Sequence, residues 1–176
     1  MRLHSPGERP LAGARLAIAD GNRGIFQTVG LMREFVKEGR CDPPIVANAR
    51  ALCQVCPEKD QFAEMYELFC FVRDQVRYVA DVLDVETISP AWYTLETLSG
   101  DCDDQAVLLA SLLEAVGIPT RFAITAYSQA REFEHVYLLG MVPDGRFIAM
   151  DPTEPGPLGG ARPTRFCAGS NRKGKS

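Results

Sequence analysis

The residues best suited to chemistry lie in residues 100–104, a short acidic turn with the sequence GDCDD. An apolar segment, residues 106–116, follows and predicts a helix that is buried on most sides. Cys102 would then stand in the first turn of this helix, where the helix dipole and the backbone N–H groups favour a thiolate. The flanking aspartates oppose that effect and suit the cap and first turn of a helix. The pattern predicts a nucleophilic cysteine; a small buried cysteine is the ordinary alternative.

A nucleophilic thiol needs a base, and the sequence holds two histidines. His4 lies in an N-terminal stretch without periodicity, whereas His135 begins an apolar segment that runs to residue 142. Such a base needs a carboxylate on its second ring nitrogen, and Asp151 directly follows the strand-like segment 146–150. Taken singly, a histidine at a strand end and an aspartate before a proline are also common structural residues.

The turn between residues 135–142 and 146–150 decides whether His135 and Asp151 can meet. The two segments read as arms of a β-hairpin joined by Pro-Asp-Gly at residues 143–145. A loop with an odd number of residues places Asp151 opposite residue 137, on the same face of the sheet as His135. An even loop would place the two side chains on opposite faces.

The remaining elements predict an α+β fold in which helices precede an antiparallel sheet. Apolar spacing indicates helices over residues 24–37, 43–56 and 60–78, an irregular extended stretch over 79–99, and a first strand over 121–127. In domain terms, we expect three parts: a poorly ordered N-terminal segment (1–20), one catalytic domain (21–160) and a polar C-terminal tail (161–176).

Composition narrows the class of protein. The net charge of −4 and the scattered basic residues argue against a nucleic-acid-binding surface. Apolar stretches are too short to span a membrane, and residues 1–20 lack the pattern of a secretory signal, so we expect a cytoplasmic protein with no membrane partner. The six cysteines would then be thiols.

Three separated motifs together resemble the transglutaminase-like superfamily. They are GDCDD with its apolar helix and the following GIPTR (117–121), EHVY (134–137) and MDPT (150–153), in the family's order. The resemblance extends from about residue 60 to 155, and upstream FVRD (71–74) and RYV (77–79) are similar to bacterial and prophage-encoded members. It implies the papain/transglutaminase-like fold, with the helix of the nucleophile packed on an antiparallel sheet.

The resemblance also implies a mechanism. Cys102 would attack an amide or thioester carbonyl of a protein or peptide, His135 would shuttle the proton, and Asp151 would orient His135. The Cys102 backbone N–H would supply part of the oxyanion hole. The family often adds an upstream aromatic or amide donor, for which Trp92 is the candidate, although a packing role suits it equally. Neither a metal nor another cofactor is implied.

The activity could be amide or peptide hydrolysis or transamidation. We expect hydrolysis, because the loop at residues 128–132 is mostly polar and offers no second apolar wall to exclude water. The alternative is a non-catalytic binding or assembly module that keeps the fold, with phage structural or assembly proteins as partners and a place in the virion.

The other cysteines suggest a third, more distant class of protein. Cys53 and Cys56 form a single CxxC pair, which with Cys41 and Cys70 could make a zinc-binding module. Because no second pair and no histidine lies near, buried structural thiols explain the pair better.

Overall fold

The computed structural model describes residues 22–81, 87–125, 135–154, 156–159 and 166–169. In chain order, the elements of these residues are α1 (Asn22–Gly39), α2 (Pro43–Cys53), α3 (Gln61–Gln75), β1 (Arg77–Tyr78), α4 (Ala91–Thr97), β2 (Ser99–Gly100), α5 (Cys102–Ala115), β3 (Thr120–Thr125), β4 (His135–Met141), β5 (Phe147–Met150) and β6 (Phe166–Gly169). Helices therefore precede the main sheet, and the α+β prediction is confirmed.

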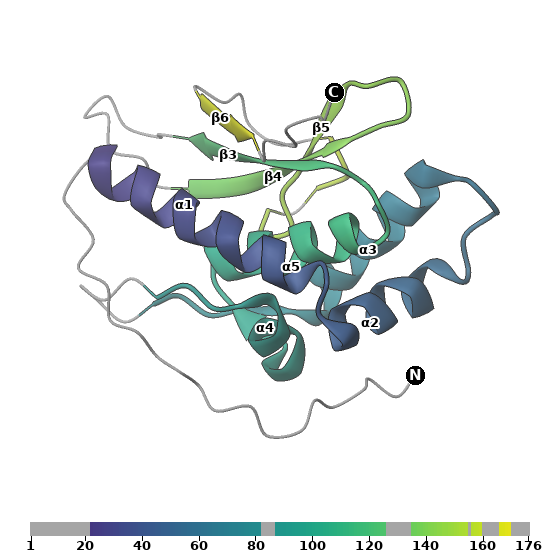
Figure 1. Cartoon of the computed structure of the whole chain (residues 1–176), viewed down its shortest axis with the longest axis horizontal. Coiled ribbons are helices and arrows are strands. Elements are labelled where there is room, and N and C mark those ends of the chain that lie inside the picture. The colour runs from purple at the N-terminus through teal and green to yellow at the C-terminus, as the bar shows by residue number, and fades with distance from the viewer. Residues whose placement is uncertain (1–21, 82–86, 126–134, 155, 160–165, 170–176) are drawn as a thin grey trace.

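Helix α5 forms the centre of the molecule. Every residue from Asp103 to Leu113 is buried, as expected for a segment with so few polar side chains. The other four helices pack around α5 on one side, and strands β3 and β4 contact it from the other (Figure 1). The N-terminus of this buried helix, where Cys102 lies, is thus fixed by the core of the domain.

The main sheet has the strand order β5-β4-β3-β6, and each neighbouring pair is antiparallel. Strand β6 pairs with β3 along the edge, with Arg121 opposite Gly169. The sequence analysis placed only a polar tail at residues 161–176, so this strand was not predicted. A four-residue edge strand between polar segments gives too weak a pattern to recognise without its partner.

The hairpin between β4 and β5 has the odd loop. Val142 accepts a hydrogen bond from Gly145 and donates one to Arg146, so three residues form the turn. Gly145 has φ 86°, which favours glycine. In the strands, Leu138 lies opposite Met150. One further step places Asp151 opposite Tyr137, so the register that brings Asp151 to the face of His135 is confirmed.

Two expected elements were wrong in detail. The third helix ends at Gln75 instead of residue 78, and residues 77–78 instead form β1, which pairs in parallel with β2. Residues 91–97, expected to be irregular, form α4. A helix of seven residues is too short for a clear periodic pattern, and packing of buried Ala91 and Leu95 stabilises it instead.

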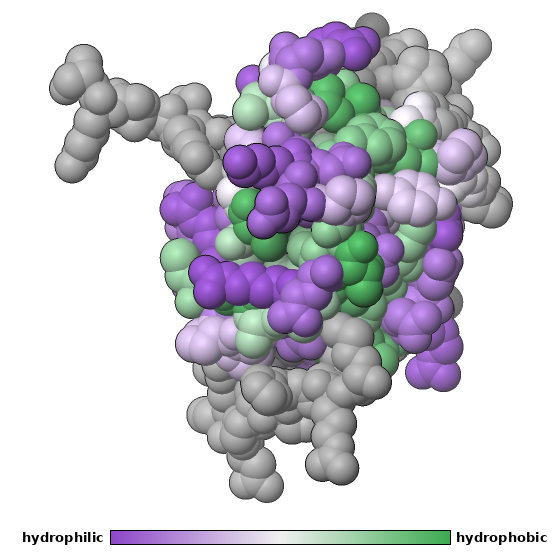
Figure 2. Space-filling model, turned by 90° about the vertical axis from the view of Figure 1, so that its right-hand side faces the viewer, coloured by the Kyte–Doolittle hydropathy of each residue, from purple (hydrophilic) through white to green (hydrophobic). Residues whose placement is uncertain are grey.

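The remaining expectations concern order and surface. The segment 1–20 and the greater part of 161–176 lie outside the described residues. None of the helices that the structure describes is long and apolar enough to cross a membrane. On the face drawn in Figure 2, hydrophilic and hydrophobic residues are interleaved.

Candidate active site

Cys102 is the first residue of α5, and its turn is held by side-chain caps. Asp101 is the N-cap, and its Oδ1 accepts the backbone N–H groups of Asp103 at 3.0 Å and Asp104 at 3.2 Å. Asp104 in turn accepts the backbone N–H of Ser89 at 2.6 Å, which ties the preceding loop to the helix. The aspartates therefore act as the cap and first-turn residues that the sequence predicted.

Gly100 is required by the same turn. A Cβ placed on it would lie 2.5 Å from the Asp104 Cβ, well inside van der Waals contact. The backbone before Cys102 can approach α5 this closely only without a side chain, so the glycine of the GDCDD motif has a packing role.

His135 and Asp151 are joined by a hydrogen bond. His135 Nε2 lies 2.6 Å from Asp151 Oδ2, and both side chains are largely buried. Asp151 Oδ1 also accepts the Thr153 backbone N–H at 3.1 Å and its hydroxyl at 2.8 Å. Burial alone would raise the pKa of Asp151, but the hydrogen bonds from His135 and Thr153 hold it below its usual value. The carboxylate is therefore ionised at neutral pH and able to orient the imidazole.

Tyr137 fixes the imidazole from another side. Its ring stacks on His135 with 6.1 Å between centroids and 29° between planes, and Tyr137 is buried. Because Nε2 faces Asp151, proton exchange with a sulfur would use Nδ1 of His135.

The Cys102 thiol lies close to the start of β4. The backbone N–H of Val136, the residue after His135, interacts with the sulfur. The thiol itself donates to Asp103 Oδ1 at 3.5 Å. Between the described residues, no hydrogen bond joins the sulfur to the His135 ring. The structure therefore brings Cys102 to the strand of His135, but with its proton directed to Asp103.

The ionisation of Cys102 differs from the expectation. Burial, followed by the charge of Asp103, raises the pKa of this thiol, and only the Val136 N–H among the stronger influences lowers it. The sequence pattern predicted a thiolate favoured by the helix dipole. Burial and the acidic neighbours therefore favour the neutral thiol in the resting structure.

Trp92 lies in α4 and packs edge-on against Tyr93, with 5.8 Å between ring centroids. That contact fits a packing role, and the oxyanion role of Trp92 stays a prediction.

Tyr78 is an aromatic residue that the sequence analysis did not single out. It lies opposite Gly100 in the β1–β2 pair and is 55% exposed. Partial burial of its hydroxyl and then the nearby Cys102 raise the pKa of Tyr78. Only the parallel pairing of two short strands reveals it.

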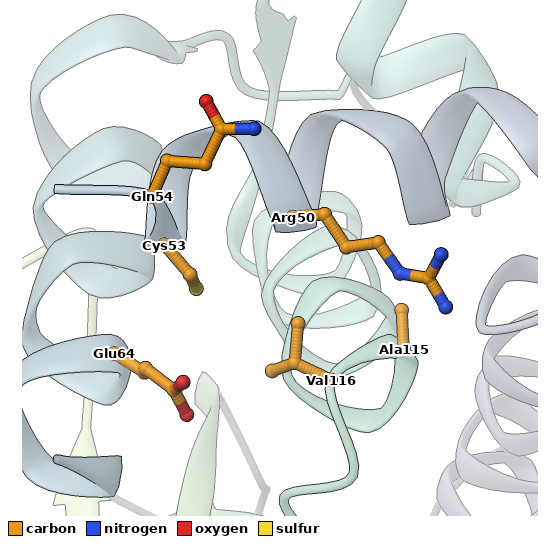
Figure 3. A pocket seen from close by; sticks show the side chains of 6 residues that line it. All are labelled: Arg50, Cys53, Gln54, Glu64, Ala115 and Val116. Carbon is orange, nitrogen blue, oxygen red and sulfur yellow. The ribbon is translucent and has the colours of Figure 1, made fainter. Parts of the chain in front are cut away.

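A separate cavity of about 400 Å³ lies at the opposite end of α5. Figure 3 shows its lining by the end of α2, by α3 and by the end of α5: Arg50, Cys53, Gln54, Glu64, Ala115 and Val116. Because α5 has 14 residues, this cavity lies about 20 Å from Cys102. Burial and then the charge of Glu64 raise the pKa of Cys53 to about 12, which fits the interpretation of a structural thiol.

Potential metal ligands gather at the nucleophile. Oxygen and sulfur atoms of Asp101, Cys102 and Asp103 lie within 4.8 Å of one another, and no other such group of three is found in the part of the chain that the structure describes. The zinc module on Cys41, Cys53, Cys56 and Cys70 is thus not assembled there. The two carboxylates already accept hydrogen bonds within the turn.

Comparison with known proteins bears on this geometry. The model of the transglutaminase-like superfamily matches residues 50–152, which is more than half of the chain and includes Cys102, His135 and Asp151. The chain belongs to the transglutaminase-like superfamily. No curated protein matches.

Several solved structures share the fold of this chain. A candidate cysteine protease from Cytophaga hutchinsonii aligns with TM-score 0.53 and 19% identity, over 70% of this chain and 42% of its own. A candidate protease from Parabacteroides distasonis aligns with TM-score 0.56 and 13% identity, over 83% of this chain and 32% of its own. The chain thus spans less than half of these two proteins. Calcium-bound LapG from Legionella pneumophila aligns with TM-score 0.52 and 20% identity, over 84% of this chain and 91% of its own.

Proposed function

We propose that this chain is a cysteine hydrolase that cleaves an amide or peptide bond through a thioester on Cys102. The observation that carries the proposal is the 2.6 Å hydrogen bond between His135 and Asp151, close to the Cys102 sulfur. The residue after His135 on β4 is Val136, whose backbone N–H interacts with that sulfur. A buried, ionised carboxylate on one ring nitrogen leaves the imidazole oriented as a base for a neighbouring nucleophile.

The resting thiol determines how the reaction begins. Because Cys102 is protonated, His135 acts as a general base at the moment of attack, and no standing ion pair is needed. The thiol must leave Asp103 Oδ1 and turn to His135 Nδ1 as substrate enters. The sulfur attacks the carbonyl carbon, the proton passes through His135 to the leaving amine, and water then hydrolyses the thioester. Because Cys102 is the first residue of α5, its backbone N–H has no acceptor within the helix. This N–H can therefore donate a hydrogen bond to the oxyanion that forms during attack.

We propose hydrolysis over transamidation on the sequence of residues 128–132. The polar loop at residues 128–132, which motivated the preference for water over an amine, lies outside the described residues. A bacterial or prophage origin, protein or peptide substrates and a cytoplasmic location likewise remain proposals. The proposal of protein or peptide substrates is prompted by two structures with the same fold, both of candidate proteases.

The test uses an activated amide or a thioester substrate with wild-type chain, Cys102→Ala and, as a matched control, Cys53→Ala. We expect acid product from wild type and from Cys53→Ala and none from Cys102→Ala. Since LapG was solved calcium-bound and EGTA-treated, each assay is run with Ca²⁺ and with EGTA. Equal rates support the metal-free reaction; activity confined to Ca²⁺ would assign the acidic turn a ligand role.

A second candidate function is the binding or assembly module, for example in a phage particle. The hydrogen bond from Cys102 to Asp103 and the raised pKa of the thiol favour it, because both keep the sulfur unreactive. On this proposal, Cys102→Ala would leave partner binding unchanged, and wild type would form no thioester with any activated substrate.

A further inference from the structure

Thr125 ends β3 directly opposite His135 on β4. Directly opposed residues of an antiparallel pair project from the same face, with Cβ atoms about 4.5–5.5 Å apart. Thr125 is only 3% exposed, and its hydroxyl has no hydrogen-bond partner. A buried hydroxyl without a partner therefore flanks the proposed base.

Such a hydroxyl is uncommon and needs an explanation, because leaving it unpaired is costly. Two other buried polar atoms of the described residues are also unpaired, the Thr94 hydroxyl and the Gln105 amide oxygen. Both lie in helices, and the Gln105 amide nitrogen still donates to Gly100. Among the three, Thr125 is the one paired with a member of the triad.

The strand order gives His135 two different neighbours. In β5-β4-β3, the strand that leads to Asp151 lies on one side of His135, and the strand that ends at Thr125 lies on the other. Asp151 engages Nε2. A water beside Thr125 could accept a hydrogen bond from its hydroxyl and donate one to Nδ1, which meets the need of a buried water for at least two polar partners.

We propose that the Thr125 hydroxyl positions the water that resolves the acyl-enzyme, an inference that rests on the proposed function. The Thr125 O–H donates to one lone pair of the water oxygen, and the other lone pair attacks the thioester carbon. His135 Nδ1 takes a proton from the water and returns it to the sulfur as the carbon–sulfur bond breaks. The products are the free acid and the Cys102 thiol, with no other reactant.

The experiment measures acylation and deacylation separately in Thr125→Val, which replaces the hydroxyl by a methyl group of similar size. With a thioester substrate, we expect the rate of the acylation burst to stay within about 2-fold and deacylation to fall by about 10–100-fold. In the presence of millimolar primary amine, the ratio of amide to acid product should rise by a similar factor. Thr125→Ser, which keeps the hydroxyl, should restore both.

Thr120→Val is the matched control. Thr120 is a buried threonine on the same strand, its hydroxyl donates to Glu114 at 2.9 Å, and it lies opposite Gly140, away from the triad. Its loss should lower stability and leave the product ratio unchanged. If Thr125→Val does not fold, the ratio is measured for Thr125→Ala against Thr125→Ser.

Two results separate the possible failures. If wild type forms an acyl-enzyme and Thr125→Val has the same deacylation rate and the same product ratio, the inference is overturned and the proposed function stands. Equal slowing of acylation and deacylation would also overturn it, because it would indicate a general loss of structure or of His135 orientation. If wild type forms no acyl-enzyme, the proposed function fails and the inference fails with it.

Discussion

Two thiols in similar electrostatic surroundings lie near the two ends of helix α5, Cys102 in its first turn and Cys53 of α2 beside its last. At the N-terminus, Cys102 has its pKa raised by burial and by Asp103; near the C-terminus, Cys53 has its pKa raised by burial and by Glu64. The cavity lies beside Cys53, and the histidine–carboxylate pair lies beside Cys102. The charges and burial around each thiol therefore do not distinguish Cys102 from Cys53. The difference is the histidine–carboxylate pair, because a cavity and a thiol do not make an active site without a base.

The largest effect should come from removing the base at one end only. His135→Ala should lower the rate of thioester formation by about 10³-fold or more, because the neutral Cys102 thiol then has no general base. Stopped-flow measurement of the acylation burst gives the rate. Glu64→Gln, beside Cys53, is the control and should leave the rate unchanged. An unaltered burst in His135→Ala would mean that His135 is not the base.

Asp151→Asn should have the next largest effect, lowering kcat by about 10²–10⁴-fold, because an amide can hold the imidazole in the wrong tautomer. The same variant also tests how the ionisation of Asp151 contributes to the stability of the fold at different pH. Since the pKa of Asp151 is lowered on folding, its stabilising contribution is present above the usual carboxyl pKa of 3.8 and is lost as pH falls below it. Thermal melts of wild type should therefore lose stability in that acidic range, and melts of Asp151→Asn should lose less.

The sequence could predict the parts of this site that depend on local pattern. The apolar run after Cys102 predicted the buried helix, and the odd loop at residues 143–145 predicted the face shared by His135 and Asp151. The hydrogen bond from Cys102 to Asp103 and the proximity of Tyr78 were beyond such reasoning, because they depend on side-chain rotamers and on strand pairs of two residues. Helix α4 and strand β6 were missed because tertiary packing, not periodicity, stabilises short elements.

Removing a charge from the acidic turn should have a smaller effect, an increase in the reactivity of Cys102. Asp103→Asn should speed the alkylation of Cys102 by iodoacetamide several-fold, up to about 10-fold for each unit by which the pKa falls. In wild type the rate should climb with pH and reach no plateau by pH 9, because the pKa of Cys102 lies above its usual 9.0. Peptide mapping measures both. Asp144→Asn, on the exposed hairpin turn, serves as the control, and slower labelling of Asp103→Asn would show that Asp103 activates the thiol.

The smallest effect concerns the rigidity of the turn. Gly100→Ala should lower the free energy of unfolding by about 1–3 kcal/mol, because its Cβ would meet Asp104 at 2.5 Å. Gly30→Ala, at an exposed helical position with nothing within 4 Å of its Cβ, should raise it by about 0.5–1 kcal/mol. Denaturant unfolding gives both values, and equal stabilities would mean that the turn relaxes around the added methyl group.

Mapping the acyl group shows directly whether Cys102 is the nucleophile. Wild-type chain is mixed with a thioester substrate, quenched in acid within the burst, digested and examined by mass spectrometry. We expect one acyl group per chain, on Cys102, that disappears as acid product forms and is missing from His135→Ala. Acyl groups spread over Cys53, Cys56 and the other cysteines, or equal acylation of Cys102 with and without His135, would contradict it.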